Sequence, residues 1–110
     1  MEKTENLDLS KYDALQKEIL EQAIRENVNL SIISNPGFNG FQMKYILDGI
    51  RNNWNIDLYA TTDFNEEQMS AICSGFRWQI DPTEYTNPSL SYIEMRSVWK
   101  SLVHKSKLPN

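Results

Sequence analysis

The sequence contains few of the residues that build metal and catalytic sites. It has one cysteine, Cys73, and one histidine, His104, which are too few for a zinc site. No acidic spacing resembles that of a calcium-binding loop. The four glycines form no glycine-rich phosphate loop. A lone cysteine cannot form an internal disulfide, so the fold does not depend on an oxidising compartment. We expect no metal, no cofactor and no enzymatic activity.

Long hydrophobic runs are absent as well. No segment approaches the roughly 20 apolar residues of a membrane-spanning helix, and the opening residues, MEKTENLDLSKYD, are too charged for a secretory signal. Hydrophobic residues nevertheless make up 40% of the chain, with three Trp, five Tyr and four Phe, which argues against disorder. We expect a single cytoplasmic domain without membrane contact.

The charge is unevenly distributed along the chain. Through Glu94 the sequence carries all fifteen acidic residues against seven Lys or Arg. After Glu94 come Arg96, Lys100, Lys105 and Lys107 with no acidic residue. Basic residues also suit the C-terminal end of a helix. An acidic body disfavours direct binding to nucleic acid. It is compatible with contact to a basic protein that itself handles nucleic acid.

The chain repeats itself with a period of 26 residues. The stretch FNGFQMKYILDGI returns 26 residues later as FNEEQMSAICSGF. Alignment at this period gives four units without gaps after an N-terminal tail. The tail is 1–9 and the units are about 10–35, 36–61, 62–87 and 88–110. One such unit cannot bury its own apolar face, whereas stacked units can.

Each unit carries the start signal of a helix. One column of the alignment holds good N-cap residues, and the column three residues later completes a capping box. These columns are Asp13, Asn39, Asn65 and Ser91, then Gln16, Gln42, Gln68 and Glu94. Asn27 and Asn53 follow the first two predicted helices and suit a left-handed turn.

The segment after each predicted helix alternates apolar and polar residues. Trp54, Ile56 and Leu58 show this pattern, which is typical of a strand. A helix of about 14 residues rises roughly 21 Å, and about seven extended residues span roughly 23 Å back. The sequence therefore predicts an α/β fold, a short helix–strand solenoid of about four coils. Pro82 favours an edge or a loop in the third return segment. The alternative is an all-helical repeat stack.

Two glycines lie in the middle of predicted helices. Gly49 and Gly75 share one column with Ala23 and Ser101. A glycine inside a helix costs roughly 1 kcal/mol relative to alanine, so its presence needs a reason. We expect the missing side chain to allow close approach of the neighbouring helix.

The two matching helices, with Tyr59-Ala60 between them, resemble tandem repeats of the type Y-A-x-x-x-F-x-x-x-Q-M-x-x-I-x-x-G-L. Such repeats occur in uncharacterised proteins of Gram-positive anaerobes, their phages and integrative elements. The resemblance covers Ile33 to Leu102. It implies a repeat scaffold in a mobile-element setting and assigns no catalytic residue. The chain departs from the pattern at Asn53 and Gln79, where glycine is usual, and at Glu94 and Ser101, which suggests specialised terminal units.

The remaining candidates for chemistry have simpler structural explanations. Cys73 shares a column with Leu47 and Trp99 and is expected in the core. The paired acids at the start of the third helix complement its macrodipole. An arginine column recurs late in three helices and offers possible contacts to phosphates or carboxylates. Alternatively, each arginine stabilises a helix C-terminus and pairs with nearby acids. The column is Arg25, Arg51 and Arg77.

Apolar residues also recur on the predicted outer face of the helices. With Met43, Ile46 and Ile50 buried, the opposite positions face solvent. A contiguous ridge that includes Trp and Tyr is typical of binding hot spots. The predicted partner-binding residues are Phe41, Tyr45, Asp48, Glu67, Trp78 and Ile93, with Leu15 and Ile19 also facing outward. The alternatives are that residues 1–11 cover the ridge, or that the buried face is rotated by one position.

Together these features predict a non-enzymatic, protein-binding repeat module. The setting implied by the resemblance suggests a concrete form, an inhibitor of a host defence nuclease of the anti-CRISPR or antirestriction type. Its acidic body would occupy a cleft meant for nucleic acid. One alternative is a self-associating structural repeat protein, so the expected state is a monomer or a homodimer. The other is a small enzyme or a phosphate-ligand binder that uses the arginine column.

Overall fold

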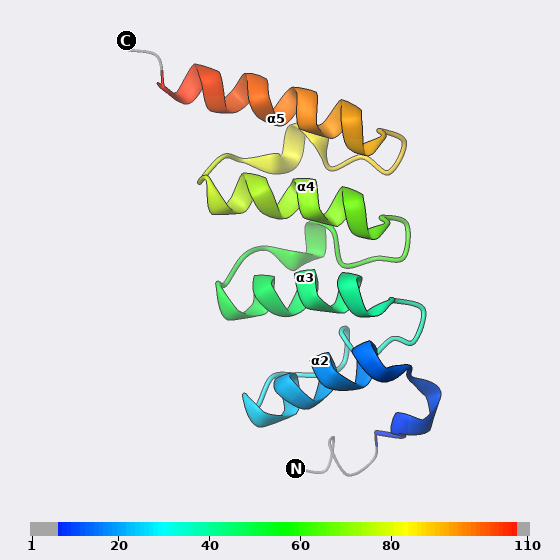
Figure 1. The fold of residues 1–110 in the computed structure, drawn as a ribbon. Coiled ribbons are helices and arrows are strands. Elements are labelled where there is room, and N and C mark those ends of the chain that lie inside the picture. Colours follow the sequence, from blue (N-terminus) through cyan, green and yellow to red (C-terminus); the bar gives the residue numbers. More distant parts are fainter. Residues whose placement is uncertain (1–6, 108–110) are drawn as a thin grey trace. The chain divides into compact units, whose positions relative to one another are not determined.

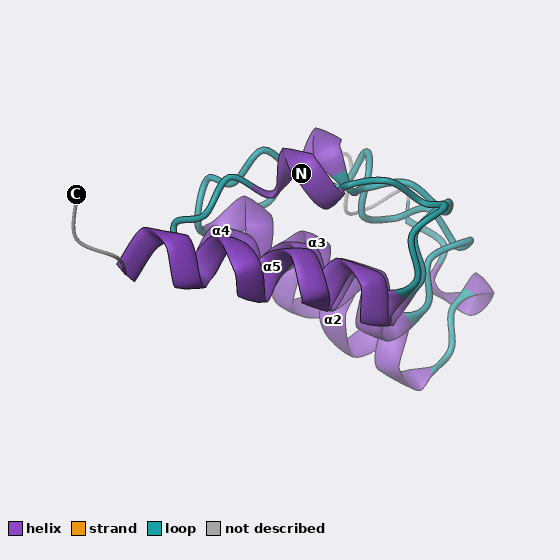
Figure 2. Cartoon of the chain, turned by 90° about the horizontal axis from the view of Figure 1, so that it is seen from above, coloured by secondary structure: helices purple, strands orange, loops and turns teal. Residues whose placement is uncertain are grey.

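The computed structural model describes residues 7–107, in which every regular element is helical (Figure 2). The chain divides into two compact units, Met1–Trp54 and Asn55–Asn110. In the first unit α2 packs along α3, and in the second α4 packs along α5 with η3 against both (Figure 1). The α-helices are α2 (Ala14–Arg25), α3 (Gly40–Arg51), α4 (Glu66–Arg77) and α5 (Tyr92–Lys107). The short 3-10 helices are η1 (Leu9–Lys11), η2 (Ile56–Leu58) and η3 (Pro82–Tyr85).

The predicted helix–strand solenoid is wrong, because residues 7–107 contain no strand. The all-helical alternative is the one compatible with the structure. Helices α2, α3 and α4 are 12 residues long and rise only about 18 Å. Fourteen residues then separate each helix from the next, so the return segment covers this distance without being extended. Instead of a strand, Ile56–Leu58 form η2, and Pro82 occupies the first turn of η3.

The four predicted helix starts are confirmed. In α2, α3 and α4 the N-cap side chain accepts a hydrogen bond from the backbone N–H three residues later. The glutamine at that position accepts from the N-cap N–H in return. Ser91 and Glu94 exchange the same two bonds at 3.1 and 2.8 Å. These capping boxes satisfy backbone donors that a helix start otherwise leaves unpaired.

Three helices also end in the same way. Asn27, Asn53 and Gln79 have φ angles of 59°, 59° and 58°, which confirms the left-handed turn predicted for the two asparagines. The next residue donates its N–H to a carbonyl five residues back, as from Val28 to Ala23 at 2.9 Å. This arrangement is the Schellman motif, and it turns the chain sharply out of each helix.

Gly75 makes room for the return segment, and the predicted approach of a neighbouring helix is wrong at this position. A Cβ atom on Gly75 would lie 2.2 Å from the hydroxyl of Tyr85 and 3.1 Å from Cβ of Pro82, both in η3. The Tyr85 hydroxyl donates to the carbonyl of Ala71 at 3.1 Å. Burial of the ring raises the pKa of Tyr85. Gly75 thus lets η3 lie directly against α4.

The glutamine of the capping box has a second role. Gln16 and Gln68 are buried, and while Oε1 accepts from the N-cap, Nε2 donates to carbonyls of the loop before the next helix. Those acceptors are Pro36 and Phe38 for Gln16, at 3.5 and 2.5 Å, and Pro88 and Leu90 for Gln68, at 3.1 and 2.7 Å. One side chain therefore fastens its own helix start to the loop that precedes the next helix.

Candidate protein-docking surface on helix α5

Helix α5 carries polar residues at positions that α2 buries. In α2 the buried positions include a glutamine, an isoleucine and an alanine. In α5 the equivalent positions hold a glutamate and two serines, and all three are exposed. The pairs are Gln16 and Glu94, Ile19 and Ser97, and Ala23 and Ser101. This face of α5 therefore lacks the side chains that α2 buries at the same positions.

An aromatic cluster, formed by Tyr92 and Trp99, lies next to Arg96 on another side of α5. Its guanidinium lies 4.8 Å from the ring centroid of Trp99 and 5.9 Å from that of Tyr92. Trp78, at the end of α4, packs edge-on against Trp99, with ring centroids 6.0 Å apart. The rings attract the cation through their π-faces. The indole N–H of Trp99 is buried without a hydrogen-bond acceptor in the described part of the chain.

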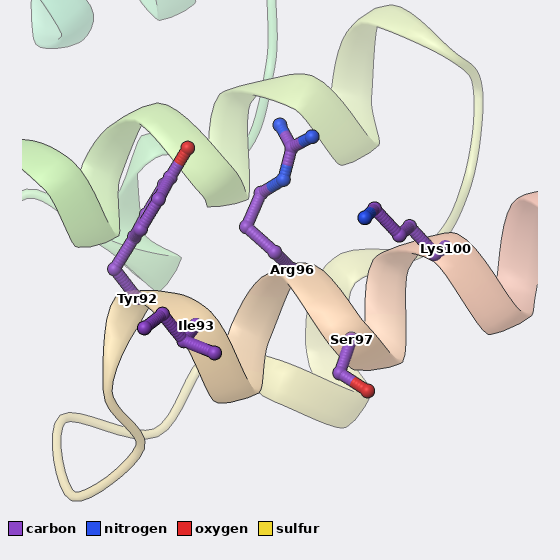
Figure 3. A pocket seen from close by; sticks show the side chains of 5 residues that line it. All are labelled: Tyr92, Ile93, Arg96, Ser97 and Lys100. Atoms are coloured by element: carbon purple, nitrogen blue, oxygen red, sulfur yellow. The ribbon is translucent and has the colours of Figure 1, made fainter.

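An open hollow of about 400 Å³ lies on this helix and is lined by Tyr92, Ile93, Arg96, Ser97 and Lys100. Figure 3 shows Tyr92, Arg96 and Lys100 extending from the same side of α5, with the Lys100 amine directed toward Arg96. Neither cation forms an ion pair with a carboxylate of residues 7–107. The hollow thus combines positive charge with apolar surface.

Three of the predicted partner-binding residues are large, exposed apolar side chains. Phe41, Trp78 and Ile93 are 49%, 53% and 77% exposed. Phe41 belongs to the first unit, whereas Trp78 and Ile93 belong to the second. In the second unit Ile93 lines the hollow and Trp78 contacts the aromatic cluster. Glu67 is exposed in the first turn of α4 and does not line the hollow.

The other residues predicted to face outward are partly exposed or buried. Tyr45 and Asp48 are only partly exposed on α3. The Lys44 amine lies 5.7 Å from the Tyr45 ring and 3.8 Å from the Asp48 carboxylate. The predicted exposure of Ile19 is wrong, because its side chain is only 4% exposed. The buried stripe of α2 includes Gln16, Ile19 and Ala23, so it is rotated from the predicted face. Leu15 is half-buried.

In the arginine column, Arg51 is already occupied by protein carboxylates. Its Nε and Nη2 donate to the two carboxylate oxygens of Glu26 at 2.8 and 2.6 Å, and Nη2 also donates to Gln22 at 3.1 Å. The hydrogen bond from Arg51 lowers the pKa of Glu26 below its ordinary value. Arg51 therefore joins the end of α3 to the end of α2. Arg25 and Arg77 are exposed at the corresponding helix ends.

The cluster around Arg96 is not among the sites predicted from the sequence. The signal was present in the spacing, since Tyr92, Arg96 and Trp99 stand four and three residues apart and so share one helix face. The absence of acids after Glu94 also fits the C-terminal end of a helix, so by itself it does not indicate a binding site. The contact with Trp78 depends on how α4 and α5 pack, which local spacing does not encode.

The described residues offer few other sites. Among residues 7–107 no three His, Cys, Asp or Glu side chains are grouped as metal ligands. No helix in this range has the length and apolar character needed to cross a bilayer. Cys73 is buried. No family model, curated protein or solved structure matches the chain.

Proposed function

We propose that this chain is a non-enzymatic protein-binding module that uses the exposed side chains of α5 and of the end of α4. The observation that carries the proposal is the exposure of Ile93 and Trp78 next to a hollow and an aromatic cluster in the same unit. Large apolar side chains gathered on a surface mark interaction sites. Trp, Tyr and Arg are also the residue types most enriched in binding hot spots.

The resemblance to mobile-element repeats suggests one concrete form of this function, the inhibition of a host defence nuclease. The excess of acidic residues through Glu94 supports it, because an acidic surface complements a cleft that binds nucleic acid. The test is DNA cleavage by such a nuclease with and without the purified chain. Inhibition that rises with the concentration of the chain is expected, and unchanged cleavage across a panel of host defence nucleases would contradict this form.

The test of binding itself is affinity purification from a host lysate with matched baits. The baits are the unaltered chain, Trp78→Ala, Ile93→Ala and Ile32→Ala. Ile32 is also exposed, at 37%, but lies in the loop between α2 and α3, so its variant is a matched control. We expect one protein to be retained by the unaltered chain and the control. Its recovery falls about tenfold or more with the other two, as for hot-spot residues.

Two results would contradict the proposal. One is that no specific protein is retained even after chemical cross-linking. The other is equal retention by all four baits, which would place the contact elsewhere. Light scattering on the purified chain separates the self-associating alternative, since a monomer at high concentration is inconsistent with it. The polar residues Glu94, Ser97 and Ser101 disfavour end-to-end stacking through that side of α5.

A further inference from the structure

Two positive side chains share the hollow on α5 without an anion from the described residues. Arg96 and Lys100 both line it, with the amine of Lys100 directed toward Arg96 (Figure 3). No carboxylate of residues 7–107 pairs with either of them. Like charges that line the same hollow repel each other, and an anion bound between them reduces the repulsion. The arrangement is therefore suited to binding a negatively charged group.

The geometry points to an acidic peptide segment of the partner protein as the occupant of this hollow. A carboxylate lies between Arg96 and Lys100, and a neighbouring apolar side chain of the segment packs against Ile93. This inference rests on the proposed function and names the chemistry of the bound segment. The charge fits, since Lys and Arg are present after Glu94 and no Asp or Glu is.

The rings beside Arg96 restrict its side chain before a carboxylate binds. Its guanidinium is held against Trp99 at 4.8 Å and near Tyr92 at 5.9 Å. A guanidinium held next to a ring loses less side-chain entropy on binding, and its planar fork of donors matches the two oxygens of a carboxylate. Such preorganisation raises affinity by lowering the cost of ordering.

The apolar part of the hollow favours a peptide over a nucleic acid. Ile93 is 77% exposed, and an aliphatic side chain gains free energy when a leucine or phenylalanine covers it. A nucleic-acid site instead needs an extended basic track and free aromatic faces for stacking. The chain has a net charge of −4, and Arg96 already lies over the rings of Tyr92 and Trp99.

Fluorescence anisotropy with defined probes tests the inference on the full chain. The probe is a labelled short peptide in which glutamates alternate with leucine and phenylalanine. Its matched controls carry glutamine or lysine in place of glutamate, and an oligothymidylate represents nucleic acid. We expect the acidic peptide to bind, with affinity falling as salt rises. The glutamine peptide should bind about tenfold more weakly, because it lacks the charge-assisted bonds.

Variants of α5 locate the site. Arg96→Gln, Lys100→Gln and Ile93→Ser should each weaken peptide binding, Arg96→Gln by about tenfold or more. Lys105→Gln removes the same charge from an exposed position of the same helix outside the hollow. It should change the affinity less than about twofold. Lys100 and Ile93 are exposed, so their variants keep the test valid if Arg96→Gln perturbs the aromatic cluster.

Four outcomes of these experiments would overturn the inference. These outcomes are no binding of the acidic peptide, equal binding of the glutamine peptide, tighter binding of the oligothymidylate, and equal losses for Lys105→Gln and Lys100→Gln. The failure of this inference can be distinguished from the failure of the proposed function. If a partner captured from lysate is lost with Trp78→Ala but retained by Arg96→Gln and Lys100→Gln, the proposed binding function stands. Only the inference of an acidic segment in the hollow then fails.

Discussion

At the scale of single residues, the fold depends on side chains that satisfy several backbone groups at once. Gln68 accepts from the N–H of Asn65 at 2.8 Å and donates to the carbonyl of Leu90 at 2.7 Å. Glutamate could replace the acceptor but not the donor. This explains the alignment column, in which glutamine occupies the buried positions and Glu94, which is exposed, takes the last one.

Substitution of Gln68 by Glu tests this dual role. The variant keeps the acceptor for Asn65 but brings a carboxylate against the carbonyls of Pro88 and Leu90, in a side chain that is only 6% exposed. We expect the free energy of unfolding to fall by about 2–3 kcal/mol. Glu94→Gln, at the exposed equivalent position, should change it by less than about 0.5 kcal/mol. Urea unfolding measures both, and equal small changes would contradict the assigned role.

A second prediction concerns the contact between Gly75 and Tyr85. Gly75→Ala should lower the free energy of unfolding by about 1–3 kcal/mol, because the new Cβ would lie 2.2 Å from the Tyr85 hydroxyl. Tyr85→Phe alone should cost about 1 kcal/mol through the lost bond to Ala71. In the double variant the hydroxyl is gone and the ring carbon is 3.3 Å away, so the loss should be smaller than the sum. Strict additivity in thermal unfolding would rule out this contact as the cause.

At the scale of elements, the helix ends show which positions a better residue would stabilise. Gln79 has a left-handed φ of 58°, which costs an ordinary side chain roughly 1–2 kcal/mol. Gln79→Gly should therefore raise the free energy of unfolding by about 0.5–1 kcal/mol, after the entropy cost of glycine. Asn27→Gly should change it by less than about 0.5 kcal/mol, because asparagine tolerates this conformation. Chemical denaturation checks both, and destabilisation by Gln79→Gly would contradict the prediction.

Helix starts and ends were predictable from the sequence because neighbouring residues determine them. The capping boxes of Asn39 and Asn65 and the turns at Asn27 and Asn53 require only side chains a few positions apart. The return segments were not predictable in the same way. Alternating apolar residues such as Ile56 and Leu58 also fit a 3-10 turn. Helices α2, α3 and α4 are 12 residues long instead of about 14, so the return segment does not need to be extended.

The candidate site was predictable only in part. Helical periodicity placed Trp78 and Ile93 on the exposed side, and both are exposed. It misplaced Ile19, since a rotation of the buried stripe by one position changes which side chains are covered. The contact of Trp78 with Trp99 joins two helices and follows from their packing, which periodicity does not specify.

The ion pair between α2 and α3 gives a prediction for acid stability. The hydrogen bond from Arg51 lowers the folded-state pKa of Glu26 below its ordinary value of 4.5. The stabilisation is therefore fully present above pH 4.5 and is lost as the pH falls through the lower folded-state pKa. Glu26→Gln should reduce the drop in Tm between neutral pH and strongly acid pH. Because the pair is exposed, the effect should be small, and an unchanged acid dependence in the variant would contradict it.

At the scale of the whole molecule, the same connection occurs in both units. In each, the glutamine at the third position of a helix donates to carbonyls 20 and 22 residues later along the chain. This spacing agrees with the 26-residue period of the sequence, because the acceptors precede the next N-cap by three residues and one. Polar residues in α5 replace the buried ones of α2, and the hollow with its aromatic cluster lies on the same helix.

Hydrogen exchange of the glutamine side-chain amides in solution tests this repeated connection most directly. If each coil is fastened through Gln16 and Gln68, their Nε2 protons should exchange at least about a hundredfold more slowly than those of a solvent-exposed glutamine. They should also show NOEs to Phe38 and Leu90, whose carbonyls they contact. Exchange at the rate of an exposed amide, or the absence of these NOEs, would contradict the connection through Gln16 and Gln68.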